Sequence, residues 1–160
     1  MRIGLGYDSH RFAAGRRLVL GGVEFPGEDG LAGHSDADVL IHAVIDALFG
    51  AAALGDIGSH FPDTDPAWKD ADSTKLLAAA ADEVAAAGYR IVNIDATVIC
   101  EHPRLSGRIG AIRERLAGVL GVPVSAVSVK GKTNEGMDAV GAGAGVAVHA
   151  VALIDDIRLA

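Results

Sequence analysis

Apolar residues recur along the chain with the spacings of helices. Between residues 36 and 53 they fall at i, i+3, i+4, i+7 and i+11, which predicts a helix with one apolar stripe and Asp36 as its N-cap. A second helix is predicted to begin at residues 72–73 and to end at Gly88, where glycine is a favourable C-terminal residue. A third helix is predicted to end at Gly121, before Pro123.

Runs of β-branched and aliphatic residues predict the strands, which cover residues 2–8, 17–25, 91–100, 127–129 and 146–157. The second run is expected to form two short strands that turn at Gly21-Gly22. We expect residues 26–36 to form a polar loop. Residues 54–71 show no periodicity because glycine and proline interrupt them repeatedly, and a stretch of this kind in a compact domain is usually functional.

These elements predict an α+β fold in one domain over residues 1–160, with a single mixed β-sheet and three helices packed on one face. The last strand is apolar on both faces: Val146, Val148 and Ala150 point one way, and Ala147 and Val151 point the other. Such a strand must be covered on both sides. The helices cover one side, and we expect a neighbouring subunit of a homo-oligomer to cover the other.

Composition narrows the classes of function. The chain has 160 residues, half of them hydrophobic, with 14 Lys and Arg against 21 Asp and Glu, a formal charge of −7. This acidic balance argues against a nucleic-acid partner and against an anionic membrane surface. The single cysteine, Cys100, excludes an internal disulfide and a multi-cysteine zinc site. With no apolar leader at the start of the sequence, a cytoplasmic location is expected.

The histidines and aspartates of the first 60 residues are the main candidates for chemistry. Asp8 and His10 share one face of the first strand, and His42 lies off the apolar stripe of the first helix, between Asp38 and Asp46. Two histidines and one aspartate with an open fourth position are typical of catalytic zinc. Asp46, four residues after His42, is expected to accept the second ring N–H of that histidine. The same spacing is also compatible with a solvent-exposed helix face on which His42 and its neighbouring aspartates bind no metal.

Two further segments suit anions. His34-Ser35-Asp36 precedes the first helix, where free N–H groups favour an anion, although simple capping explains it as well. Lys132, Thr133 and Glu135 suit phosphate oxygens and a bridging magnesium ion, although an exposed charged loop has the same composition. A Walker A loop is excluded, because Ala126 stands where that motif requires glycine.

Taken together, these segments resemble the 2-C-methyl-D-erythritol 2,4-cyclodiphosphate synthases, zinc-dependent phosphorus–oxygen lyases of the non-mevalonate isoprenoid pathway. The resemblance runs from end to end. Its main carriers are Asp8-Ser-His10, His34-Ser-Asp-Ala-Asp38, Phe61-Pro-Asp-Thr-Asp-Pro66 and Lys132-Thr-Asn-Glu135.

The resemblance implies a role for each matching residue. Asp8, His10 and His42 are the implied zinc ligands, and Glu135 the implied ligand of Mg²⁺ or Mn²⁺ bridging the substrate phosphates. His34 and Thr133 are the implied catalytic residues. The implied substrate contacts are Asp8, Ser9, His10, His34, Ser35, Asp56, Ile57, Gly58, Phe61, Pro62, Asp63, Thr64, Asp65, Cys100, Glu101, His102, Pro103, Arg104, Leu105, Ser106, Lys132, Thr133, Asn134 and Glu135.

The reaction that the resemblance implies is the cyclisation of 4-diphosphocytidyl-2-C-methyl-D-erythritol 2-phosphate with release of CMP, in a homotrimer whose active sites lie between subunits. A zinc-dependent phosphoester hydrolase and a non-catalytic metal- or nucleotide-binding trimer are the alternatives. One region departs from the family. Ala139, Ala142 and Ala144 stand where many members have Phe, Arg and Glu around a cavity on the trimer axis. Without that arginine, tight binding of an isoprenoid diphosphate there is not expected.

Overall fold

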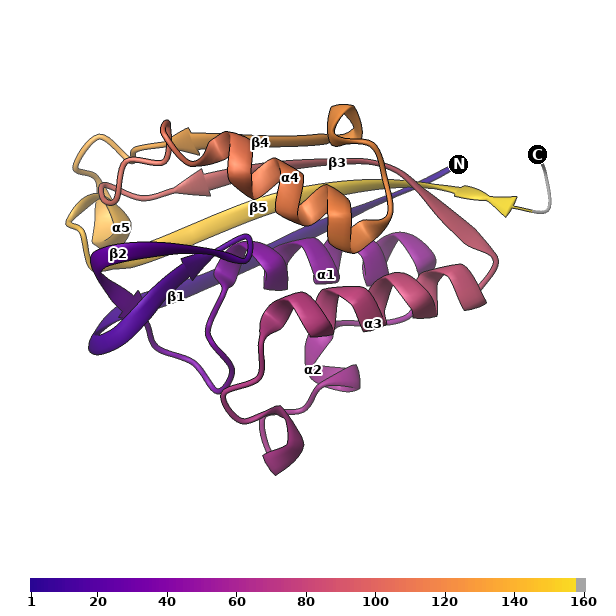
Figure 1. Ribbon diagram of the computed structural model, residues 1–160, viewed down its shortest axis with the longest axis horizontal. Coiled ribbons are helices and arrows are strands. Elements are labelled where there is room, and N and C mark those ends of the chain that lie inside the picture. Colours follow the sequence, from indigo (N-terminus) through magenta and orange to yellow (C-terminus); the bar gives the residue numbers. More distant parts are fainter. Residues whose placement is uncertain (158–160) are drawn as a thin grey trace.

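The computed structural model describes residues 1–157; residues 158–160 lie outside the described part. One five-stranded mixed sheet has the order β2-β1-β5-β3-β4, in which only β3 and β4 pair in parallel (Figure 1). The strands are β1 Arg2–Leu20, β2 Val23–Leu31, β3 Tyr89–Ile99, β4 Val127–Lys132 and β5 Gly145–Asp156. The α-helices are α1 Val39–Ala52, α2 Ile57–His60, α3 Ser73–Ala86, α4 Ile109–Leu120 and α5 Asp138–Gly141, and 3-10 turns cover Pro66–Trp68 and Val124–Ala126.

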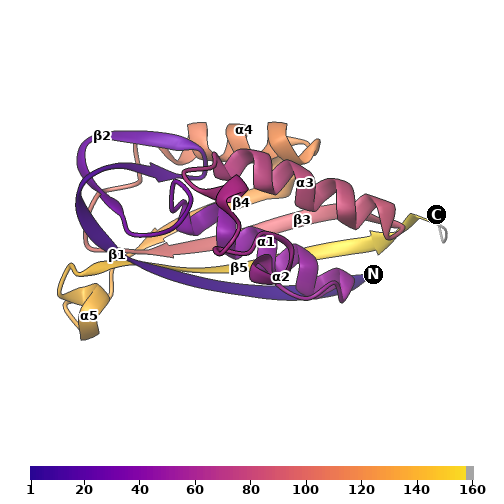
Figure 2. The ribbon, with the colours of Figure 1, turned by 90° about the horizontal axis from the view of Figure 1, so that it is seen from below.

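The α+β class and the single mixed sheet are confirmed, but the number of helices is not. The described residues contain five α-helices rather than three. The three long ones, α1, α3 and α4, lie on one side of the sheet, whereas the one-turn helix α5 sits at its end, beside the start of β5 (Figure 2). The predicted ends of α3 and α4 at Gly88 and Gly121 agree closely with the structure. None of the described helices is long and apolar enough to cross a membrane.

The start of the chain is more regular than its sequence predicts. β1 continues to Leu20 rather than ending at residue 8, and β2 continues to Leu31, through most of the segment expected to be a loop. The turn at Gly21-Gly22 is confirmed, with φ of 61° and 72° at the two glycines, values that residues with side chains rarely adopt. The first half of this long β1, residues 2–11, pairs with β5, and the second half, residues 12–20, pairs with β2.

Helix α1 is the centre of the core. It lies between β1 and α3, and most of its side chains are buried. It begins at Val39 with Asp38 as N-cap, so the prediction of Asp36 as the cap is wrong. Asp38 is fully buried. Its Oδ1 accepts the Gly21 and Ile41 N–H groups at 2.8 and 3.1 Å and its Oδ2 accepts that of Gly22 at 2.7 Å, which offsets the cost of burying the carboxylate. One carboxylate therefore ties the β1–β2 turn to the start of α1.

The opposite face of the sheet is apolar and uncovered in the single chain. On β1, Ile3, Leu5 and Tyr7 are 71, 67 and 53% exposed, and they pair with Leu153, Val151 and His149 of β5. The last strand is thus apolar on both faces, as predicted, with only one face covered by helices of its own chain.

Candidate metal centre

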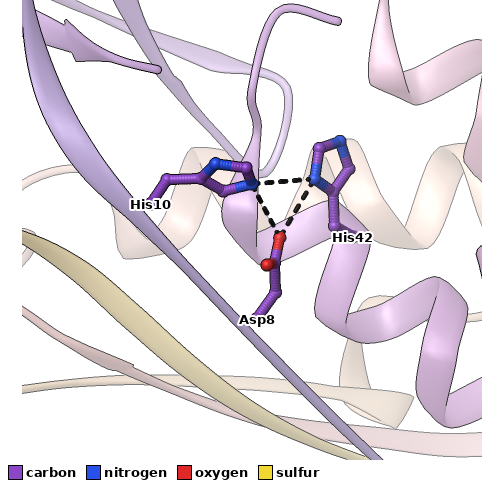
Figure 3. A group of neighbouring side chains, drawn as sticks. All are labelled: Asp8, His10 and His42. Atoms are coloured by element: carbon purple, nitrogen blue, oxygen red, sulfur yellow. Dashed lines mark hydrogen bonds and ion pairs between the residues drawn. The ribbon is translucent and has the colours of Figure 1, made fainter. Parts of the chain in front are cut away.

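Asp8, His10 and His42 meet at one point between β1 and α1 (Figure 3). The Oδ2 atom of Asp8 lies 2.9 Å from His10 Nε2 and 3.0 Å from His42 Nδ1, and the two ring nitrogens are 3.3 Å apart. Two imidazole nitrogens and a carboxylate oxygen that converge in this way can hold a metal ion. The grouping predicted from the sequence is therefore confirmed in space.

The close approach of α1 to β1 depends on two glycines. Gly4 and Gly6 lie on the same face of β1 as Asp8 and His10, because residues two apart share a face. A Cβ atom on Gly6 would lie 1.9 Å from the Ala43 carbonyl oxygen, and one on Gly4 would lie 2.0 Å from that of Ala47. The backbone of α1 therefore packs directly against β1, and this close packing places the His42 imidazole next to the Asp8 carboxylate.

Asp8 and His10 perturb each other's protonation. Burial by itself would raise the pKa of Asp8, but the hydrogen bonds and charges of His10 and His42 outweigh it and hold that pKa far below its ordinary value. Burial would likewise lower the pKa of His10, but the hydrogen bond and charge of Asp8 and the bond to the Ala32 carbonyl raise it. Asp8 is thus a carboxylate throughout the neutral range, as a metal ligand must be.

Each imidazole is oriented by a bond at its other nitrogen. The Nδ1–H group of His10 donates to the Ala32 carbonyl oxygen at 2.6 Å. His42 Nε2 lies 3.1 Å from Ser35 Oγ and 3.2 Å from Ser73 Oγ. Both rings therefore direct their remaining nitrogen at the common point.

The prediction that Asp46 orients His42 is wrong. Asp46 Oδ1 accepts the Ile57 N–H at 2.8 Å, and burial raises the pKa of this carboxyl. A separation of four residues puts two side chains on one helix face, but the imidazole of His42 turns toward β1 and α3 instead. Asp46 instead attaches the start of α2 to α1.

A cavity of about 510 Å³ opens beside the three ligands. The sequence predicted many of its lining residues: Asp8, His10, His34, Ser35, His42, Ile57, Gly58, Phe61, Pro62 and Asp63. It did not predict the apolar wall formed by Trp68 and Leu76, because nothing in their local sequence marks them; they reach the cavity only through the packing of residues 66–68 and α3 beside it. The cavity thus combines polar groups at one end with an apolar wall.

A second cavity of about 380 Å³ contains most of the remaining predicted residues and shares none with the first. Its lining includes Cys100, Glu101, Pro103, Arg104, Leu105, Ser106, Lys132 and Thr133. Burial raises the pKa of the Cys100 thiol to about 11, which makes this cysteine an inert apolar group. Within one chain, the predicted catalytic pair His34 and Thr133 is therefore divided between two cavities.

The other predicted residues lie outside both cavities. Asp56 caps α2 by accepting the Ser59 N–H, Asp65 caps the turn at residues 66–68, and Thr64 lies between them on the same segment. Ser9 alternates onto the uncovered sheet face, and the His102 ring contacts that of Phe12 in a tilted arrangement, with 4.6 Å between the ring centroids. Asn134 donates its backbone N–H to Glu101, and Glu135 accepts the Thr133 hydroxyl at 2.8 Å.

Comparison with known proteins agrees with this geometry. The model of the YgbB family matches residues 1–155. The chain belongs to the YgbB family. It is 55% identical over 156 residues to the 2-C-methyl-D-erythritol 2,4-cyclodiphosphate synthase of Gloeobacter violaceus, a match that covers 98% of this chain and 96% of that protein. The resemblance inferred from the sequence motifs is confirmed.

Two other matches extend the comparison. The bifunctional enzyme IspD/IspF of Anaeromyxobacter sp. is 57% identical over 98% of this chain, which corresponds to 40% of that longer protein. A solved structure of 2C-methyl-D-erythritol-2,4-cyclodiphosphate synthase in a CDP-bound form superimposes with a TM-score of 0.88 at 38% identity, covering 96% of this chain and all of that one. Fold and family are thus supported by both sequence and structure.

Proposed function

We propose that this chain converts 4-diphosphocytidyl-2-C-methyl-D-erythritol 2-phosphate into 2-C-methyl-D-erythritol 2,4-cyclodiphosphate and releases CMP. The observation that carries the proposal is the Asp8–His10–His42 group, which opens into a cavity of substrate size. The proposal is also supported by sequence: over nearly its whole length, the chain is 55% identical to a protein named 2-C-methyl-D-erythritol 2,4-cyclodiphosphate synthase.

The donor set fits zinc. Three protein ligands with nitrogen and oxygen donors, all within 4.8 Å of one another, leave a fourth position toward the cavity, which is typical of catalytic rather than structural zinc. When bound, the ion would neutralise phosphate charge and polarise the attacked phosphorus.

The residues around the ligands would bind and orient the substrate. Its own 2-phosphate oxygen attacks the β-phosphorus, one P–O bond forms and the P–O bond to CMP breaks, so the protein need not supply a nucleophile. The main task is therefore to hold two mutually repelling phosphates in line. His34 and Ser35 lie at the cavity where they can donate to phosphate oxygens, and Ile57, Gly58 and residues 61–63 would enclose the methylerythritol. The remaining members of that predicted segment, Asp56, Thr64 and Asp65, would hold its turns in shape.

The second cavity suits the cytidine and diphosphate groups. Residues 100–106 would surround the nucleoside, and Lys132 and Thr133 of the cavity wall would hold the diphosphate. Asn134 and Glu135, which follow them directly outside the cavity, would complete this group, with Glu135 as ligand of Mg²⁺ or Mn²⁺. A single substrate must reach both cavities, although they share no lining residue within one chain. An active site between two copies of the chain, with Thr133 of one facing His34 of the other, meets this requirement.

The uncovered sheet face supports a homotrimer. Ile3, Leu5 and Tyr7 with Val151 and Leu153 form an apolar surface on the side opposite the three long helices. Contiguous apolar surfaces of this kind usually mark subunit interfaces. We place this face at the centre of the trimer, with the exposed Ala139, Ala142 and Ala144 near one end of its axis, where they offer no charge to an isoprenoid diphosphate. A single domain over residues 1–160 and a cytoplasmic location complete the proposal.

Phosphorus NMR tests the reaction directly. Incubation of the cytidylyl substrate with the zinc- and magnesium-loaded protein should give CMP and a cyclic diphosphate in equal amounts. In water enriched in oxygen-18 the product should carry no label; incorporated label would establish a zinc-dependent hydrolase instead. Binding of cytidine nucleotides with no turnover would leave a non-catalytic trimer as the function. His42→Ala should fold normally and release no CMP, because one of three metal ligands is lost.

A further inference from the structure

A buried chain of hydrogen bonds connects His42 to a carboxylate that the reaction does not use. Ser73, the first residue of α3, is fully buried. Its Oγ lies 3.2 Å from His42 Nε2, and its hydroxyl also donates to Asp36 Oδ1 in a short hydrogen bond. Its backbone N–H donates to the other carboxylate oxygen, Asp36 Oδ2, at 3.0 Å.

Donor and acceptor roles along this chain run in one direction. A carboxylate oxygen only accepts, so the single hydroxyl proton of Ser73 is committed to Asp36. The Ser73 oxygen can then only accept from His42, which places the ring proton of that histidine on Nε2. Ser35 Oγ, which lies 3.1 Å from the same nitrogen, accepts the Ala37 N–H, and its own proton has another acceptor in Ser73 Oγ, 3.5 Å away. When a metal ion occupies the site, the Nδ1 nitrogen, which lies 3.0 Å from Asp8 Oδ2, is then free to supply its lone pair to that ion.

We infer that Ser73 and Asp36 are positioning residues for the metal centre: through the chain Asp36–Ser73–His42 they hold the His42 imidazole in the tautomer and orientation that direct Nδ1 at the metal. A carboxylate that orients a ligating histidine is a common device in metal sites, and here a serine hydroxyl is inserted between the two groups. His10 is held by the Ala32 carbonyl instead, so His42 is the ligand whose orientation depends on side chains. This inference rests on the proposed zinc-dependent function.

Zinc affinity is the primary test, measured by competition with a chromophoric chelator at fixed pH and without substrate. Ser73→Ala should raise the dissociation constant for zinc roughly 10–100-fold. Asp36→Asn should raise it less but in the same direction, because a neutral amide oxygen accepts the serine proton more weakly. Thr74→Val is the matched control: it removes a buried hydroxyl at the next position of α3, one that bonds Asp72 rather than His42, and should leave zinc affinity unchanged.

A second measurement needs no variant of Ser73. In zinc-loaded wild-type protein labelled with nitrogen-15, the ring correlations of His42 should show a protonated Nε2 and a metal-bound Nδ1. The opposite pattern would overturn the inference, as would a Ser73→Ala protein whose zinc affinity is within twofold of wild type. If Ser73→Ala does not fold, Asp36→Asn and this spectrum decide the question.

The outcomes separate this inference from the proposed function. Wild-type protein that binds zinc but releases no CMP would refute the cyclase and leave the positioning chain intact. Full turnover by wild type, together with unchanged zinc affinity in Ser73→Ala and Asp36→Asn, would support the cyclase and refute the positioning chain.

Discussion

Replacing Gly6 by alanine tests whether the glycine contact between β1 and α1 builds the metal centre. The added methyl carbon would lie 1.9 Å from the Ala43 carbonyl oxygen and 2.7 Å from the Ala47 nitrogen. Both atoms belong to the helix backbone and cannot rotate away. Ordinary contacts begin at 3.4 Å, so α1 must move by about 1.5 Å or the strand must bend.

The effect on the metal follows from this displacement. His42 precedes Ala43 on α1, and its Nδ1 lies 3.0 Å from Asp8 Oδ2. Zinc–ligand distances tolerate deviations of only about 0.2 Å. We therefore expect Gly6→Ala to weaken zinc binding by roughly tenfold or more, comparable to the loss of a group that orients a ligand. Overpacking should also lower the free energy of unfolding by about 1–3 kcal/mol.

The assay combines chelator competition for zinc with thermal unfolding in the presence of EDTA. Gly118→Ala is the control, since Gly118 is exposed on α4 and has nothing within 4 Å of an added Cβ. That variant should bind zinc normally and gain up to about 1 kcal/mol from helix propensity. A Gly6→Ala protein with wild-type zinc affinity and melting temperature would show that close approach at this glycine does not position His42.

Four further predictions concern carboxylates and pH. Asp38→Ala removes the acceptor of three N–H groups, two of them at Gly21 and Gly22. It should lower the free energy of unfolding by roughly 2–5 kcal/mol in denaturant titrations. A loss below about 1 kcal/mol would contradict the role of Asp38 in joining the β1–β2 turn to the start of α1. Burial raises the pKa of Asp38 from 3.8 to about 6 in the folded protein, so the protonated carboxyl stabilises the fold most below pH 3.8, and that contribution is lost as pH rises through 6. Asp38→Asn should flatten this part of the curve of unfolding free energy against pH. An unchanged curve would show that the pKa of Asp38 is not raised by burial. Because the pKa of His10 is raised in the metal-free protein and zinc must displace that proton, zinc affinity should increase from pH 6 to pH 8 in chelator titrations, whereas a flat profile would exclude a protonated His10. Asp46→Ala should leave zinc affinity unchanged but raise KM several-fold, because it releases the Ile57 N–H and with it that part of the cavity wall. A large loss of zinc affinity would instead show that Asp46 orients His42.

Local sequence determined those features that depend on spacing along one element. The period of two in a strand puts Asp8 and His10 on one face, and the helical stripe places His42 off the core side of α1. The glycines after α3 and α4 end those helices where the sequence predicts, since Gly88 and Gly121 adopt the positive φ that other residues avoid.

Tertiary structure decided the features that depend on which groups meet. Asp36 and Asp38 are equally good caps by sequence, and the N–H groups of buried Gly21 and half-buried Gly22 select Asp38 because they need an acceptor. Asp36 is then free to bond Ser73, which lies 37 residues away. No local pattern encodes such a contact: the partner of a polar group is fixed by which unsatisfied donor or acceptor the packed core brings against it, and that requires the whole fold.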